Sequence, residues 1–289
     1  MSLSQLSVPL TKEQAYALVD AVMERDDLAL TASAHEDEET GEWVFEATCE
    51  ETPDLDSFSE LARQTLGGAV AFRVETIDPE VNWVARSLEG LAPVTAGGFY
   101  VYGSHETAPV PENLMGIRID AAQAFGTGHH ETTTGCLEAL DIVLRRMTPR
   151  NILDVGTGTG ILAIAAAKRT RLPVLASDID PISVSTTIDN ARDNGVGDLI
   201  TAVTATGLDH RLIAGNAPFD LVLANILAGP LVDLAPGMAE ITKRGSVVIL
   251  SGLLDTQAQR VLDAYAAVGL AISQKLQRKE WMTLVLERL

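Results

Sequence analysis

Three closely spaced glycines are the most informative feature of this chain. Gly156, Gly158 and Gly160 follow a stretch at 152–155 that is apolar at three of its four positions, and they precede a stretch rich in Ala and Leu at 161–168. The first stretch predicts a buried strand, and the second predicts the start of a helix, because Ala and Leu favour helices. Glycine lets the backbone turn sharply and lets a ligand approach without a Cβ in the way. The pattern therefore indicates a nucleotide-binding turn between a strand and a helix.

The spacing of these glycines narrows the class of nucleotide. Dinucleotide-binding turns read G-x-G-x-x-G, in which the third glycine packs the helix against the strand. Here the pattern is G-x-G-x-G, and Asp154 precedes it. A carboxylate is a poor neighbour for a pyrophosphate but a good one for a cation or the ammonium group of an amino acid. This disfavours a nicotinamide-dependent dehydrogenase, while the alternative that the glycines only form a tight turn stays open at this point.

A second acidic residue completes the predicted cofactor site. Asp178 ends an apolar stretch at 173–177 and follows Gly156 by 22 residues. An acidic residue at the end of the second strand of such a fold accepts hydrogen bonds from ribose hydroxyls. A site that binds a ribose and an ammonium group, but no pyrophosphate, favours S-adenosylmethionine. With Asp154 and Asp178 in place, a turn without a ligand is the weaker interpretation.

Another apolar stretch, at 219–224, ends in Asn225 and is followed by Ile-Leu. A nitrogen nucleophile needs its N–H groups held by oxygen acceptors, so that its lone pair points at the methyl carbon. The side-chain carbonyl of Asn225 and the backbone carbonyl of Leu227 are the expected acceptors. No aromatic residue follows Asn225, which disfavours stacking of a flipped base. The alternative is that Asn225 caps a helix, a position that Asn favours.

The segment at 124–134 contains two glycines and four threonines, and a helix is predicted to begin at its last three residues. We expect it to close over the cofactor and Thr133 to donate a hydrogen bond to it, with helix capping by Thr as the alternative. For His129 and His130, a surface or structural role is as good an interpretation as catalysis. A general base is not required, because desolvation near a sulfonium charge lowers the pKa of a lysine from about 10.4.

Composition excludes several classes of protein. The two cysteines, Cys49 and Cys136, give neither a disulfide framework nor a metal-binding spacing, so we expect no metal site. No signal peptide is evident, and no apolar run approaches the roughly 18 residues that span a membrane. We therefore expect a cytoplasmic protein that does not bind membranes. We also expect a monomer.

The negative charge lies almost entirely in the first part of the chain. Residues 1–120 hold 23 acidic and 6 basic side chains, whereas residues 121–289 hold 17 and 15. The negative electrostatic field of these residues repels nucleic acid and attracts basic partners. We expect the N-terminal part to dock a basic protein, although a merely solubilising surface is the common alternative for charged runs.

The N-terminal part has the element order of a ferredoxin-like α+β domain, predicted over residues 1–77. Its order is β-α-β-β-α-β, with a capping box formed by Thr11 and Gln14. The predicted strands are 3–10, 28–33, 42–49 and 70–75, and the predicted helices are 12–25 and 55–66. Residues 78–120 are predicted to form a connector, with a helix over 78–91 and a strand over 99–102.

Residues 121–289 alternate between helix and strand, which predicts an α/β, doubly wound, Rossmann-like and mostly parallel sheet. The predicted strands are 152–155, 174–177, 200–204, 221–224, 247–251 and 282–286, and the predicted helices are 132–146, 161–168, 182–194, 231–241 and 255–267. Ligands of such sheets bind beyond the carboxyl ends of the strands. The glycine turn, Asp178 and Asn225 all fall at that edge.

Four motifs together resemble the bacterial methyltransferases of large-subunit ribosomal protein eleven, the PrmA type of the class I S-adenosylmethionine-dependent superfamily. They are Ala-Phe-Gly-Thr-Gly-His-His-Glu-Thr-Thr, Leu-Asp-Val-Gly-Thr-Gly-Thr-Gly, Ser-Asp-Ile-Asp-Pro and Ala-Asn-Ile-Leu-Ala-Gly-Pro. The resemblance implies cofactor contacts on Thr133, Gly156, Asp178 and Asn225 and a substrate-recognising N-terminal domain. It also implies methylation of lysine ε-amines and of the N-terminal α-amine of that ribosomal protein.

The sequence therefore predicts an S-adenosylmethionine-dependent protein-lysine N-methyltransferase. Asn225 and Leu227 would position the amine, while Thr133, Asp154, Gly156, Gly158, Gly160, Asp178 and Asn225 would bind the cofactor. The alternatives are a small-molecule N-methyltransferase and a non-catalytic cofactor-binding factor for ribosome assembly.

Overall fold

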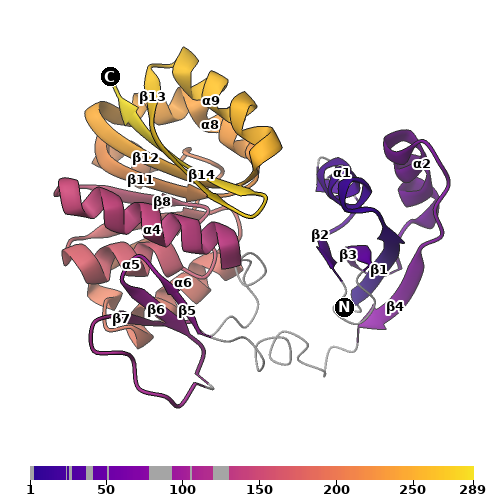
Figure 1. Ribbon diagram of the computed structural model, residues 1–289, viewed down its shortest axis with the longest axis horizontal. Helices are drawn as coiled ribbons and strands as arrows, with labels where there is room; N and C mark the ends of the chain where they lie inside the picture. The colour runs from indigo at the N-terminus through magenta and orange to yellow at the C-terminus, as the bar shows by residue number, and fades with distance from the viewer. Residues whose placement is uncertain are drawn as a thin grey trace. The chain divides into compact units, whose positions relative to one another are not determined.

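The computed structural model describes residues 3–23, 25, 28–36, 42–50, 52–77, 93–104, 106–119 and 130–289. The chain divides into two compact units, Met1–Trp83 and Val84–Leu289 (Figure 1). The described residues 93–119, which the sequence assigned to a connector, belong to the second unit. The domain boundaries predicted at residues 77 and 120 stay predictions.

The first unit holds an antiparallel sheet in the order β2-β3-β1-β4, together with two helices. The bounds are β1 Leu3–Leu10, α1 Lys12–Met23, β2 Thr31–Glu36, β3 Trp43–Glu50, α2 Leu55–Leu66 and β4 Arg73–Ile77. This is the predicted ferredoxin-like arrangement. The capping box at the start of α1 is also as predicted, since Thr11 N donates to Gln14 Oε1 at 3.2 Å and Gln14 N donates to Thr11 Oγ1 at 3.3 Å.

The core of this unit forms where one face of each helix meets the sheet. Ala15, Leu18, Val19 and Val22 line the buried face of α1 and pack in one cluster with Phe45 and other sheet residues. Two strands begin later than their apolar residues suggested, β2 at Thr31 and β4 at Arg73. The reason is that Leu28, Val70 and Phe72 join the core from connecting segments rather than from strands.

The second unit is built on a seven-stranded sheet in the order β10-β9-β8-β11-β12-β14-β13. Neighbouring strands from β10 to β12 are parallel, and β14 is antiparallel to both β12 and β13. The strands are β8 Ile152–Val155, β9 Val174–Asp178, β10 Ile200–Thr204, β11 Phe219–Asn225, β12 Thr242–Leu254, β13 Leu270–Arg278 and β14 Trp281–Arg288. The helices are α4 His130–Arg146, α5 Ile161–Thr170, α6 Pro181–Asp193, α7 Arg211–Asn216, α8 Ala228–Glu240 and α9 Ala258–Ala267.

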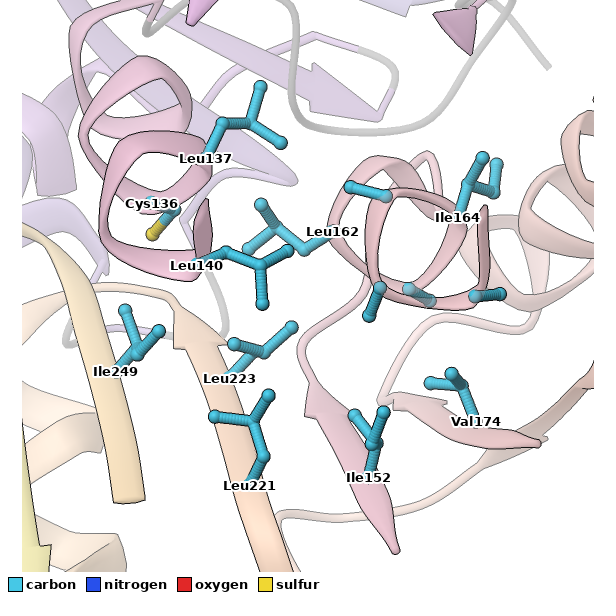
Figure 2. Packing of buried hydrophobic residues seen from close by; sticks show 14 of the residues in the cluster. Cys136, Leu137, Leu140, Ile152, Leu162, Ile164, Val174, Leu221, Leu223 and Ile249 are labelled. Atoms are coloured by element: carbon cyan, nitrogen blue, oxygen red, sulfur yellow. The ribbon is translucent and has the colours of Figure 1, made fainter. Parts of the chain in front are cut away.

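Helices cover both faces of this sheet, as predicted for a doubly wound fold. α4, α5 and α6 pack on one face and α8 and α9 on the other (Figure 1). α7 packs in the same cluster as α8 and α9. Figure 2 shows Leu140 and Leu162 of the helices packed against Ile152, Leu223 and Ile249 of the strands. Because both faces of the central strands are covered, all four residues of β8 are buried.

Three short strands that follow the first unit pack on this core. β5 Val94–Ala96, β6 Phe99–Tyr102 and β7 Met115–Arg118 form a separate sheet, of which the sequence predicted only β6. Ala96, Phe99 and Ile117 are buried in the same cluster as α4 and α5. The helix predicted over 78–91, with Trp83, lies outside the described residues. Within the described part of the chain, no helix is long and apolar enough to cross a membrane.

Candidate functional site

The carboxyl ends of the central parallel strands bring three predicted site residues to one edge and one face of the sheet. Asp154 pairs with Leu223 of β11 and Ala176 of β9, which places Asn225 and Asp178 each two residues further on. Side chains alternate along a strand, so all three point to the side covered by α4 and α5. The sequence predicted the shared edge, and the register adds the shared face.

The glycine turn joins β8 to α5 at this edge. Gly156, Gly158 and Gly160 have φ angles of 67°, 55° and 84°, a region that favours glycine. The turn is bonded to the next strand, because Thr157 N donates to Ser177 O at 3.0 Å. Gly160 immediately precedes α5, so the start of this helix faces the site as the sequence predicted.

Asp154 lies beneath the turn and is 1% exposed. Its Oδ2 accepts hydrogen bonds from Thr157 Oγ1 at 2.7 Å and from Ala163 N at 3.1 Å, so it ties the turn to the first residues of α5. Its Oδ1 is buried and has no hydrogen-bond partner among the described residues. Burial raises the pKa of Asp154 to about 7, although the two hydrogen bonds offset part of that rise. These contacts support a role in orienting the turn.

Asp178 also holds the turn. One carboxylate oxygen accepts from Gly158 N at 2.8 Å, and the other accepts from Asp180 N at 3.1 Å. Asp178 is half-buried, and each carboxylate oxygen can accept a second hydrogen bond. The side chain is therefore fixed in orientation and still able to accept hydrogen bonds from a ligand.

Asn225 is the last residue of β11 and is half-buried. It does not cap the following helix, because the N-cap of α8 is Leu227. The alternative interpretation of Asn225 as a helix cap is therefore wrong. The backbone carbonyl of Leu227 accepts the first hydrogen bond of α8, from Leu231 N at 3.1 Å, which leaves one lone pair for a ligand.

Thr133 lies half-buried in the first turn of α4, between the buried residues Thr132 and Thr134. Two residues that the sequence analysis missed anchor this turn. The hydroxyl oxygens of Ser251 and Thr283 lie 2.9 Å apart, and Ser251 Oγ lies 3.4 Å from the carbonyl oxygen of Thr132. Ser251 ends an apolar run of β12 opposite Asn225, a register that one sequence could not reveal.

Other parts of the predicted site lie outside the described residues. They are residues 124–129 of the predicted closing segment, including His129, and the side chain of His130. Among the described residues, no group of three or more His, Cys, Asp or Glu side chains is arranged to hold a metal ion.

The model of one protein family matches residues 3–289, and its description is ribosomal protein L11 methyltransferase (PrmA). The chain belongs to this family. The ribosomal protein L11 methyltransferase of Rhodopseudomonas palustris (strain BisB5) is 50% identical over 265 residues, which cover 91% of this chain and 89% of that protein. The relative of the same name from Rhizobium meliloti (strain 1021) is 44% identical over 300 residues, which cover 100% of both chains.

A solved structure supports the same assignment. The crystal structure of ribosomal protein L11 methylase from Lactobacillus delbrueckii subsp. bulgaricus has 33% sequence identity and a TM-score of 0.61, and the match covers 68% of this chain and 99% of that chain. The predicted family and fold class are thus confirmed. As a member of this methyltransferase family, the chain uses S-adenosylmethionine as its cofactor.

Proposed function

We propose that this chain transfers methyl groups from S-adenosylmethionine to lysine ε-amines and to the N-terminal α-amine of ribosomal protein L11. The observation that carries this proposal is the position of Asn225. It ends β11 beside the glycine turn, it is not a helix cap, and its side-chain amide makes no hydrogen bond with another described residue. A carbonyl oxygen oriented in this way can accept an N–H from a substrate amine.

The residues at the sheet edge fit the cofactor. Asp178 keeps acceptor capacity for the ribose hydroxyls, and the turn from Gly156 to Gly160 presents a backbone with positive φ angles beside it. Asp154 holds that turn, and Thr133 lies in the first turn of α4. When bound, the cofactor supplies an electrophilic methyl group on a sulfonium.

The chain's own residues would orient the nucleophile. The amine attacks with its lone pair, so its N–H groups need acceptors, which the Asn225 side-chain carbonyl and the Leu227 backbone carbonyl would provide. Desolvation of the lysine lowers its pKa and favours the neutral amine, so no side chain is needed to accept its proton in the transfer step. Repeated methylation requires the amine to rotate and the cofactor to be exchanged between rounds.

The first unit would recognise the protein substrate. Residues 1–120 carry most of the net negative charge of −19, and such a field favours a basic protein over nucleic acid or an anionic membrane surface. We propose that the chain acts on L11 in the cytoplasm, as a monomer.

The test is intact-mass spectrometry of L11 purified from cells that lack this enzyme, after incubation with the enzyme and S-adenosylmethionine. We expect mass gains in steps of one methyl group. Asn225→Ala should reduce the initial rate by about 100-fold, because misplacing a reacting group by an ångström has an effect of that order. Asn216→Ala is the matched control, since Asn216 is an exposed asparagine at the end of α7.

The other outcomes separate the alternatives. Mass gain with Asn225→Ala at the wild-type rate would refute the assignment of Asn225. Cofactor binding by calorimetry without any mass gain would reject L11 as the substrate and favour a small-molecule acceptor or a non-catalytic role.

A further inference from the structure

Ile226, the residue between Asn225 and Leu227, lies in close contact with two glycines. A Cβ placed on Gly156 would lie 2.2 Å from Cγ2 of Ile226, and one placed on Gly252 would lie 2.4 Å from the carbonyl oxygen of Ile226. Both glycines also have positive φ angles, of 67° and 84°, so the backbone alone already favours glycine there. It is the distances that show how closely Ile226 packs against each neighbour.

The two contacts reach Ile226 from different segments of the chain. Gly156 begins the glycine turn directly after β8, whereas Gly252 lies in β12. Ile226 N also donates to Ser251 O of β12 at 3.1 Å. Residue 226 is therefore held to β12 by its backbone and contacts the glycine turn through its side chain.

The side chain of Ile226 is directed away from that of its neighbour Asn225. Ile226 packs against the core cluster under α8 and α9, whereas Asn225 points to the α4 side of the sheet. Its Cγ2 methyl group thus contacts the glycine turn from the α8 and α9 side of the sheet, whereas the proposed amine site lies on the α4 side. This methyl group is therefore a direct contact between the glycine turn and the residue that follows Asn225.

We propose that Ile226 is a positioning residue, whose Cγ2 methyl group sets the distance between the glycine turn and Asn225. This proposal rests on the proposed function, in which the turn holds the cofactor and Asn225 holds the amine. Methyl transfer needs the two reacting atoms in line and close, so a small change in this distance reduces the rate more than it changes the binding of either partner.

The first part of the test compares three variants by melting temperature, cofactor Kd from calorimetry and single-turnover methyl transfer to L11. Ile226→Ala removes Cγ2, and we expect the rate to fall at least about tenfold with a cofactor Kd within about threefold. Ile226→Val keeps Cγ2 and should restore a rate within about threefold of the wild type. Val232→Ala is the matched control, a half-buried residue of α8 that packs on the same cluster and should lower the melting temperature without changing the rate.

The second part is a double-mutant cycle on cofactor affinity, which needs no substrate. Gly156→Ala alone should weaken cofactor binding, because its Cβ would collide with Ile226. The variant with both Gly156→Ala and Ile226→Ala should bind the cofactor more tightly than Gly156→Ala alone, since the collision is relieved.

Two results would overturn the proposal. One is a rate for Ile226→Ala equal to that of Val232→Ala at matched stability, and the other is a cycle in which the two substitutions do not couple. If the wild type does not methylate L11, the proposed function is wrong. The double-mutant cycle on cofactor affinity then still measures the contact between Gly156 and Ile226.

Discussion

At the scale of single residues, Asp154 combines burial with a specific hydrogen-bonding task. Its carboxyl group ties Thr157 and Ala163 together, and burial raises its pKa to about 7. The nearby thiol of Cys136 is also fully buried, and burial raises its pKa to about 12, so it stays neutral. Of these two buried groups, only the carboxyl group of Asp154 changes its charge near neutral pH in the folded protein, because its pKa is about 7.

Asp154→Asn should alter how the stability of the second unit depends on pH. The folded pKa lies above the unfolded one, so the folded protein binds more protons between about pH 4 and pH 7, and the wild type loses stability as pH rises through that window. The amide accepts the same two hydrogen bonds but does not ionise. We expect the variant to gain in unfolding free energy relative to the wild type between about pH 5 and pH 8, by about 3 kcal/mol, because about two pH units of this window lie below the folded pKa.

Denaturant titrations of both proteins at these two pH values measure the effect. Asp154→Ala is the control that loses both hydrogen bonds and should be less stable than Asp154→Asn at either pH. Parallel stability curves for the wild type and Asp154→Asn would show that the carboxyl group does not titrate in this range. A large loss of cofactor affinity in Asp154→Asn would instead favour a direct contact with the cofactor ammonium.

At the scale of elements, a network of ion pairs joins the start of α4 to the hairpin between β13 and β14. Lys279 Nζ lies 2.9 Å from Glu131 Oε1, and Arg278 Nε donates to Glu138 Oε2 at 3.1 Å. Arg278 also forms an ion pair with Glu131. The pKa of the Glu131 carboxyl group is lowered, chiefly by the hydrogen bond from Lys279. Glu131 shares the first turn of α4 with Thr133, so the network steadies the part of the helix that faces the site.

Arg278→Glu should destabilise the second unit by about 1 kcal/mol, because partly exposed ion pairs contribute modestly even in a network. This corresponds to a fall in melting temperature of roughly 2–4 °C for a unit of this size. Cofactor affinity should fall as well, since the first turn of α4 loses its anchor. Thermal melts and calorimetry measure both effects.

A charge-swapped double variant separates the loss of the ion pair from the change in charge. Glu138→Arg combined with Arg278→Glu restores an ion pair and should recover most of the lost stability. Arg260→Glu, on the exposed side of α9, reverses a charge without touching the network. If it lowers the melting temperature as much as Arg278→Glu does, the network has no specific role.

The elements that carry the site could be predicted from the sequence because burial on both faces leaves an uninterrupted apolar signal. β8 and β10 have the predicted bounds, and Asn225 ends β11 at the expected residue. β13 was missed because it is an edge strand paired only with β14, and Ser273 and Lys275 are exposed there. The contacts of Ser251 and Ile226 could not be predicted, since they depend on register and on distances between strands.

At the scale of the whole molecule, the two units would divide recognition from chemistry. The first unit lies within the strongly acidic residues 1–120, whereas the glycine turn, Asp178 and Asn225 lie in the second. Charge acts at long range and mainly increases the rate of encounter with an oppositely charged partner. Cofactor binding depends on short-range hydrogen bonds and should not respond to charges on the first unit.

Replacing Glu13, Glu50 and Asp56 by Lys tests this division. All three are exposed acidic residues of the first unit. We expect KM for L11 to rise by about tenfold at low salt, and by less as salt screens the attraction, while the cofactor Kd stays unchanged. Replacing Asp198, Asp233 and Glu240 by Lys makes the same change of charge on exposed residues of the second unit and should affect KM less.

Asp178→Ala should affect cofactor binding and not substrate binding, which is the opposite of the charge reversals in the first unit. It removes the proposed ribose acceptor, which lies far in sequence from the acidic residues of the first unit. It should weaken cofactor binding and leave the affinity for L11 intact. The division of roles requires these two patterns to stay separate. An equal rise in KM from both sets of charge reversals would mean that total charge, and not the first unit, attracts the substrate. A loss of cofactor affinity in the first-unit variant would mean that the two units do not act separately.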